Sequence, residues 1–142
     1  MGASVKSVLV LPPTALSFGS QVPLEGGDVY ADAADPRNLP QWAAGLARSE
    51  VRPQDDAWVA DAPFGQARIS FAAQNDFGVM DHDVELASGL VVHNPMRVMP
   101  CGKGSELFFS LFRQPEMTDE QFAADGLAVE ADLQRLKELL EQ

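Results

Sequence analysis

The C-terminal stretch from Thr118 to Glu141 is the longest segment of the chain with unbroken helical periodicity. Thr118, followed three residues later by Gln121, has the pattern of a capping box and predicts where the helix begins. Its apolar residues recur at steps of three and four and so line one face: Phe122, Gly126, Val129, Leu133, Leu136 and Leu140. At 1.5 Å per residue the helix would be a rod of roughly 36 Å. A rod with one apolar face must lie on another surface, and we expect the β-rich sequence before it to supply that surface.

The composition limits the class of protein. The chain has 142 residues, 46% of them hydrophobic and 22% charged, which is typical of one soluble globular domain. A formal net charge of −11 argues against partners that need clustered Lys or Arg, namely nucleic acid and an anionic membrane surface. The single cysteine, Cys101, excludes an internal disulfide, and no stretch approaches the length of a membrane span. We therefore expect a cytoplasmic protein that does not insert into membranes.

The chain divides into a leader and one domain. Residues 1–13 read as a loosely attached leader, and residues 14–142 as a single folded unit. Within that unit Ala15–Val22 alternates and predicts a first strand. The next residues are interrupted by prolines and glycines, which favours two short helices, Asp28–Ala34 and Leu39–Ala47.

Turn signals between Ala47 and Pro115 recur at the spacing of consecutive antiparallel hairpins. They are Gln54-Asp55-Asp56, Pro63-Phe64-Gly65, Asn75–Gly78, Ala87-Ser88-Gly89 and Cys101–Gly104. The last three fix a register, and the pairs that follow are Phe71 with His82, Ile69 with Val84, His82 with Asn94, Val84 with Val92, Met96 with Phe109, Asn94 with Leu111 and Val92 with Arg113. All these residues share one largely apolar face, which a slip of one residue would destroy.

The opposite face of this predicted sheet is polar, with one apolar patch. Arg68 lies opposite Glu85 and His93 opposite Asp83, as expected of charge pairs on a solvated surface. Phe108 and Phe112 also point outward. An exposed aromatic pair of this kind indicates a partner surface, and we expect a homodimer contact there unless the leader or the C-terminal segment covers it.

One segment resembles a known family. The stretch VYADAADPRNLPQWAAGL (Val29–Leu46) resembles the helical corner of the START-like superfamily, which includes Bet v 1-type and polyketide cyclase/dehydrase-like (SRPBCC-type) proteins. The matching residues are Val29, Tyr30, Asp35, Pro36, Leu39 and Trp42. The later stretches NDFGVMDHDV, NPMRVMP and ELFFSLFRQPEM and the final helix resemble the same family, so the match runs from about residue 14 to the end.

The resemblance implies an α+β helix-grip fold. A bent seven-stranded antiparallel sheet would wrap around the C-terminal helix, with two short helices after the first strand. A cavity between sheet and helix would hold an apolar ligand. The residues expected to line it are Trp58, Phe71, Met80, His82, Asn94, Met96, Phe109 and Arg113 from the sheet, with Phe122 and Gly126 from the helix.

Three of these residues each allow two interpretations. His82 beside Asn94 could hold a hydroxyl or carbonyl group and act as an acid or base near neutral pH, or it could be a hydrogen-bonded core histidine. Arg113 could meet a ligand carboxylate at the cavity mouth or pair with a nearby Asp or Glu. Gly126 either lets the helix pack closely or leaves room for a ligand.

Other chemistries find little support in the sequence. The two histidines fall on opposite faces of the predicted sheet, which argues against a shared zinc site. No pattern indicates a cofactor. Three functions then remain, in descending order of support. The first is binding of an apolar, aromatic or lipid-like molecule. The second is a cyclase/dehydrase-like enzyme with His82 as acid or base, disfavoured because no carboxylate points inward in these registers. The third is an interaction protein with a filled core.

Overall fold

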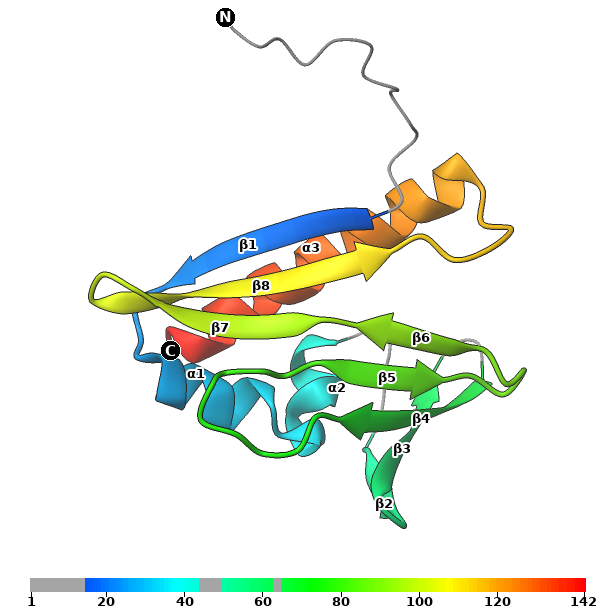
Figure 1. Ribbon diagram of the computed structural model, residues 1–142, viewed down its shortest axis with the longest axis horizontal. Coiled ribbons are helices and arrows are strands. Elements are labelled where there is room, and N and C mark those ends of the chain that lie inside the picture. The colour runs from blue at the N-terminus through cyan, green and yellow to red at the C-terminus, as the bar shows by residue number, and fades with distance from the viewer. Residues whose placement is uncertain (1–14, 44–49, 63–64) are drawn as a thin grey trace, which may run out of the picture.

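The computed structural model describes residues 15–43, 50–62 and 65–142 (Figure 1). The predicted leader, the end of the second predicted helix and the turn at Pro63-Phe64 lie outside these ranges. The described residues form an α+β fold in which a long C-terminal helix packs on antiparallel strands, with short helices after the first strand.

The strands and helices follow one another in a simple order. The strands are β1 (Ala15–Val22), β2 (Arg52–Gln54), β3 (Ala57–Ala62), β4 (Gly65–Phe71), β5 (His82–Glu85), β6 (Val91–Asn94), β7 (Met96–Cys101) and β8 (Gly104–Phe112). The helices are α1 (Gly26–Ala33), the 3₁₀ turn η1 (Pro36–Asn38), α2 (Leu39–Trp42) and α3 (Asp119–Leu140). The first strand has its predicted bounds, and the described part of the second predicted helix is the four-residue α2.

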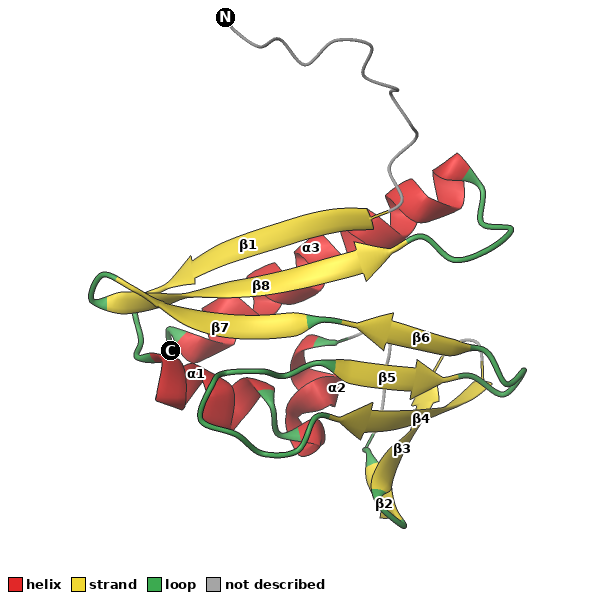
Figure 2. Ribbon diagram, viewed as in Figure 1, coloured by secondary structure: helices red, strands yellow, loops and turns green. Residues whose placement is uncertain are grey.

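Helix α3 begins at the predicted capping box. The Thr118 hydroxyl accepts a hydrogen bond from the Gln121 backbone N–H at 3.1 Å, and the Gln121 side chain accepts one from the Thr118 N–H at 2.9 Å. These two bonds satisfy N–H groups that a helix start otherwise leaves unpaired. Figure 2 shows α3 running behind β1, β8 and β7. Its predicted apolar face is buried except at Val129, which is half-buried.

The predicted registers are confirmed over most of the sheet. The structure pairs His82 with both Phe71 and Asn94, and Val84 with both Ile69 and Val92. Met96 lies opposite Phe109. Two turn glycines have positive φ, Gly89 at 92° and Gly102 at 61°, a conformation that glycine adopts without strain. Local alternation and turn chemistry therefore determined these pairings.

The expectation of one seven-stranded sheet is wrong. The described residues form eight strands in two sheets, one with the order β1-β8-β7 and the other with the order β2-β3-β4-β5-β6. The two predicted pairs beyond Pro95, Asn94 with Leu111 and Val92 with Arg113, are absent from the β7–β8 ladder. Pro95 has no N–H, so it cannot complete the ladder there, and β6 parts from β8.

Hydrogen bonds nonetheless connect the two sheets at the corner between them. Strands β6 and β7 follow one another in the chain with only Pro95 between them (Figure 1). On the far side of this corner, the Asp81 carboxylate accepts hydrogen bonds from the Met96 backbone N–H and from the Arg97 side chain, both at 2.9 Å. The Met80 N–H also donates to the Met96 carbonyl at 2.8 Å. The hydrogen bonds of Met96 therefore join the two sheets on the β7 side of Pro95. On the β6 side of Pro95, strand β6 is not paired with β8.

Candidate functional site

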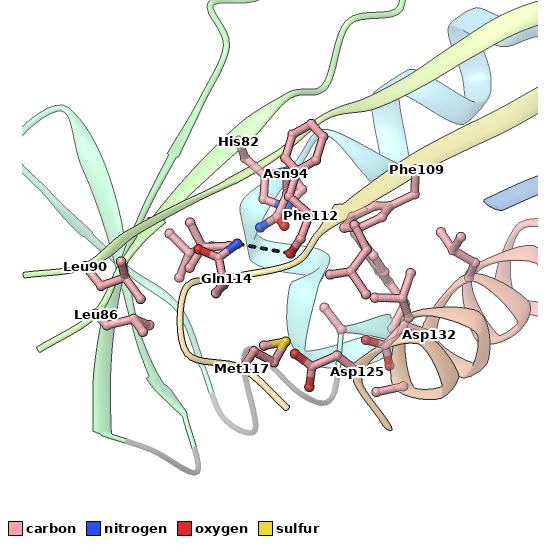
Figure 3. Close-up of a pocket in the computed structure, with 18 residues that line it drawn as sticks. His82, Leu86, Leu90, Asn94, Phe109, Phe112, Gln114, Met117, Asp125 and Asp132 are labelled. Atoms are coloured by element: carbon pink, nitrogen blue, oxygen red, sulfur yellow. Dashed lines mark hydrogen bonds between the residues drawn. The ribbon is translucent and has the colours of Figure 1, made fainter. Parts of the chain in front are cut away.

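A cavity of about 380 Å³ lies on the side of Pro95 where β6 and β8 separate, between these strands and α3 (Figure 3). Most of its lining is apolar. The lining residues are Trp42 and Ala43 from α2 and the residue after it, His82, Val84, Leu86, Leu90, Val92 and Asn94 from the β5–β6 hairpin, Phe109, Leu111 and Phe112 from β8, Gln114 and Met117 from the following loop, and Asp125, Ala128, Val129, Asp132 and Leu133 from α3. Three of the predicted site residues, His82, Asn94 and Phe109, are in this set.

His82 sits on β5 and is only 4% exposed. Its Nδ1 lies 3.0 Å from the Met80 carbonyl oxygen, and since a carbonyl only accepts, Nδ1 carries the hydrogen. The ring stacks on Phe71, with ring centroids 4.8 Å apart. Burial lowers the pKa of His82 below its usual 6.5, so the imidazole is neutral near pH 7. A neutral ring with hydrogen on Nδ1 leaves a lone pair on Nε2, and Nε2 makes no hydrogen bond with a described residue.

Asn94 sits on β6, directly opposite His82 in the register. It is 9% exposed, and its amide group makes no hydrogen bond with any residue in the described ranges. Figure 3 shows the Asn94 amide and His82 close together on the strand side of the cavity. Among the side-chain N and O atoms of the described residues, Trp42 Nε1 on the cavity wall is fully buried without a hydrogen-bond partner. The free atoms of His82 and Asn94 instead face the open cavity, where an occupant can meet them.

The helical wall of the cavity carries carboxylates. Asp125, Ala128 and Asp132 recur at steps of three and four along α3 and so share a face beside the buried stripe. Burial raises the pKa of Asp125 from 3.8. The predicted sheet registers bring no carboxylate inward, and both carboxylates of the lining come from α3 instead. The helical spacing of Asp125 and Asp132 next to Val129 was the signal in the sequence.

Arg113 shapes the mouth of the cavity without lining it. Its guanidinium pairs with Asp119 and donates to the Met117 carbonyl at 2.8 Å. The guanidinium carbon also lies 5.7 Å from the Phe122 ring centroid. Of the two interpretations of Arg113, the structure shows the pairing with a nearby acid. These contacts hold the loop that brings Gln114 and Met117 to the cavity.

Gly126 and Phe122 pack away from the cavity. A Cβ added at Gly126 would lie 3.0 Å from Leu16 Cδ1 and 3.7 Å from Phe18 Cζ, both on β1. The missing side chain therefore lets α3 approach β1 closely. Phe122 is 5% exposed and Met96 is fully buried, and neither lines the cavity.

The remaining predicted site residues surround a different hollow. Trp58, Phe71 and Met80 line a depression of about 540 Å³ that also includes Tyr30 and Val79. Because Phe71 stacks on His82, that ring pair lies between the depression and the cavity. The residues of the predicted inward face thus line two separate hollows, the cavity beside α3 and the depression beside Tyr30. The lining residues that the sequence reasoning did not assign to a site include Trp42, Leu86, Leu90, Gln114 and Met117.

On the outer face, Asp83 pairs with His93 as predicted. Arg68 lies opposite Glu85 in the predicted register, but its ion pair is with Asp56. Phe108 is half-buried over a shallow hollow, and Phe112 is 39% exposed at the cavity mouth. A homodimer through these rings stays a prediction. Within the described ranges, no group of His, Cys, Asp and Glu could hold a metal ion, and no helix is long and apolar enough to cross a membrane.

No protein-family model matches this sequence, and neither does any curated protein. Solved structures share its fold at low identity. The structure of DynU16, from the dynemicin biosynthetic locus, has a TM-score of 0.70 and 16% identity over 92% of this chain, which spans only 48% of the DynU16 chain. That of Ara h 8.0201 has a TM-score of 0.61 and 12% identity, covering 89% of this chain and 96% of the other.

A third structure, the Aha1 dimer from Colwellia psychrerythraea, has a TM-score of 0.71 and 11% identity, again covering 89% of this chain and 96% of the other. Identities this low establish the fold alone. The three neighbours have the fold that the resemblance of the helical corner and the final helix predicts.

Proposed function

We propose that this chain, which has the START-like fold, binds a small apolar or aromatic ligand in the cavity between α3 and the strands. The cavity itself carries the proposal. At about 380 Å³, with a mostly apolar lining and a few polar side chains, it has the size and character of a small-molecule site.

The fold neighbours add support by analogy. DynU16 comes from the locus for dynemicin biosynthesis, so at least one protein of this fold accompanies small-molecule chemistry. Because one fold can host unrelated functions, the weight of the proposal rests on the residues of this chain. An interaction protein with a filled core would have left no cavity of this size, and so it ranks below ligand binding.

A cyclase/dehydrase-like enzyme is the second candidate, and the state of His82 favours it. A neutral imidazole with a free Nε2 lone pair is a general base, and Asn94 opposite it could hold a substrate carbonyl. The test is His82→Gln, assayed with the molecule that co-purifies with the protein. Retained binding with lost conversion supports the enzyme with His82 as its base. Unchanged conversion would show that His82 is not the base, and no conversion by the parent protein supports a carrier. Unfolding of the variant would show that His82 serves the core.

The first experiment for ligand binding is denaturing extraction of the purified protein, followed by mass spectrometry of small molecules against a mock purification. A stoichiometric apolar or aromatic compound supports the proposal. Binding is then tested with N-phenyl-1-naphthylamine, a neutral dye that fluoresces in apolar sites.

Two variants of α3 test whether the dye binds in the cavity. Ala128→Trp puts a large ring on the cavity wall, and Ala123→Trp is the matched control, since Ala123 is exposed on the same helix and does not line the cavity. We expect Ala128→Trp to abolish dye binding and Ala123→Trp to leave it intact. Equal binding by the parent protein and both variants would show that the dye, and with it the proposed ligand, does not use this cavity.

A further inference from the structure

The polar wall of the cavity has a specific pattern of unused hydrogen-bonding capacity. On His82, Nδ1–H is committed to the Met80 carbonyl, so the free Nε2 can only accept a hydrogen bond. On Asn94, the amide N–H₂ can donate, and it has no partner among the described residues. The two residues face each other across adjacent strands, where opposed side chains have Cβ atoms about 5 Å apart.

A hydroxyl group satisfies both residues at once. Its hydrogen can go to His82 Nε2 while its oxygen accepts from the Asn94 amide. A hydrocarbon cannot do either, and it would seal two polar groups away from water without partners, which is costly. A ketone or ether could accept from Asn94 but would offer nothing to His82.

The charge of the lining argues against an acidic ligand. Among the described lining residues the ionisable groups are His82, which burial keeps neutral, and the carboxylates of Asp125 and Asp132 on α3. No Lys or Arg stands in that set. Within the described lining, a ligand carboxylate would therefore meet no Lys or Arg and would share the cavity with the carboxylate of Asp125 (Figure 3).

From this arrangement we infer that the ligand is a neutral, largely apolar molecule carrying a hydroxyl group, which binds between His82 Nε2 and the Asn94 amide. The inference rests on the proposed ligand-binding function and specifies its ligand class. It also gives Asn94 a role in binding rather than in folding, because its side chain contributes no hydrogen bond to the described structure.

Four probes on one two-ring body test the inference by displacement of N-phenyl-1-naphthylamine. They are 2-naphthol, 2-methylnaphthalene, 2-methoxynaphthalene and 2-naphthoate. The methyl compound has nearly the shape of the naphthol but forms no hydrogen bond, the methoxy compound only accepts, and the naphthoate is an anion. We expect 2-naphthol to bind about tenfold more tightly than 2-methylnaphthalene, with the methoxy compound between them and the naphthoate weakest.

Asn94→Leu separates a binding role from a structural one. Leucine has a similar size and removes an amide that has no described partner, so the urea midpoint should stay the same or rise, while the preference for 2-naphthol over 2-methylnaphthalene should fall about tenfold. The control is Val92→Leu, on the same strand and also lining the cavity, which should change both affinities alike. Asn94→Ala repeats the measurement with a smaller side chain.

The outcomes are distinguishable. If 2-naphthol keeps its preference in Asn94→Leu and Asn94→Ala, or if 2-naphthoate binds best, the hydroxyl inference is overturned while ligand binding stands. A large drop in the urea midpoint of both variants would also overturn it, since Asn94 would then serve the fold. If none of the probes, 2-methylnaphthalene included, displaces the dye from the parent protein, the proposed function itself fails.

Discussion

The carbonyl oxygen of Pro95 accepts a hydrogen bond from the Ser110 N–H at 3.0 Å, and Pro95 returns none because it has no N–H. Two residues in such an antiparallel pair ordinarily exchange two bonds. The β7–β8 ladder therefore weakens where β6 and β8 begin to separate. Asn94 and Leu111, which a continuous ladder would pair, instead lie on the cavity wall.

Pro95→Ala should narrow the cavity. The variant supplies the missing N–H to the Ser110 carbonyl, so the ladder can extend toward Asn94. The new hydrogen bond and the greater freedom of the unfolded chain oppose each other, and we expect unfolding free energy to change by less than about 1 kcal/mol. Affinity for N-phenyl-1-naphthylamine should fall. Pro100→Ala, at the other end of β7, is the control and should leave dye affinity unchanged. Equal affinities of Pro95→Ala and the parent protein would contradict this account of the cavity.

The buried His82 makes stability depend on pH. Burial lowers its pKa in the folded state below the 6.5 of the unfolded chain, so the unfolded chain binds more protons between these two values. Its contribution is fully present above pH 6.5 and is lost as the pH falls through that window, by at most about 1.4 kcal/mol per pH unit. Urea unfolding of the parent protein and His82→Gln at pH 5 to 8 measures this. We expect a flatter profile for the variant, and parallel profiles would show that His82 does not titrate in this way.

Gly126 is expected to serve packing and not ligand binding. Gly126→Ala gains about 1 kcal/mol of helix propensity but places a methyl 3.0 Å from Leu16 Cδ1, so unfolding free energy should change by less than about 1 kcal/mol. Gly126→Leu overfills the same contact and should cost about 1 to 3 kcal/mol. Neither variant should alter dye affinity. Loss of dye binding by Gly126→Leu at unchanged stability would instead support the view that this glycine leaves room for a ligand.

Asn75 holds the loop between β4 and β5. Its Nδ2 donates to the carbonyls of Ala73 and Val79, both at 2.9 Å, and its Oδ1 accepts from the N–H groups of Phe77 and Val79 at 2.9 and 3.1 Å. Asn75→Ala removes all four bonds and should lower unfolding free energy by about 2 to 3 kcal/mol. Asn75→Asp keeps the accepting oxygen and should cost less. Chemical denaturation measures both, and equal losses would show that the two accepted bonds add no stability.

The outer aromatic residues predict a dimer that can be tested directly. Phe108 lies on the outer face of β8 beside Met99 and Arg97, and Phe112 is exposed at the end of the same strand. Phe108→Asp places a charge at the centre of this surface and should convert a dimer to a monomer. Sedimentation equilibrium of the parent protein and the variant measures the mass. A parent protein that is monomeric at high concentration would end the prediction.

Much of this fold follows from local sequence. The capping box of Thr118 and Gln121 determines where α3 begins, because both of its bonds are made within one turn. Gly89 and the alternation on either side of it determine the β5–β6 register, because a slip of one residue would turn Val84 and Val92 outward. His82 and Asn94 were placed opposite each other on this basis alone.

The tertiary structure decided what local patterns do not contain. A ladder of alternating residues is consistent with one continuous sheet, and only the separation of the strands beyond Pro95 divides it in two and places the cavity there. The same separation leaves Phe71 and Met80 at one hollow and Phe109 at another. The role of Gly126 depended on which strand α3 meets, and β1 lies more than 100 positions earlier in the chain (126 − 22 = 104). Contacts between segments that distant are set by packing, and periodicity within either segment does not encode them.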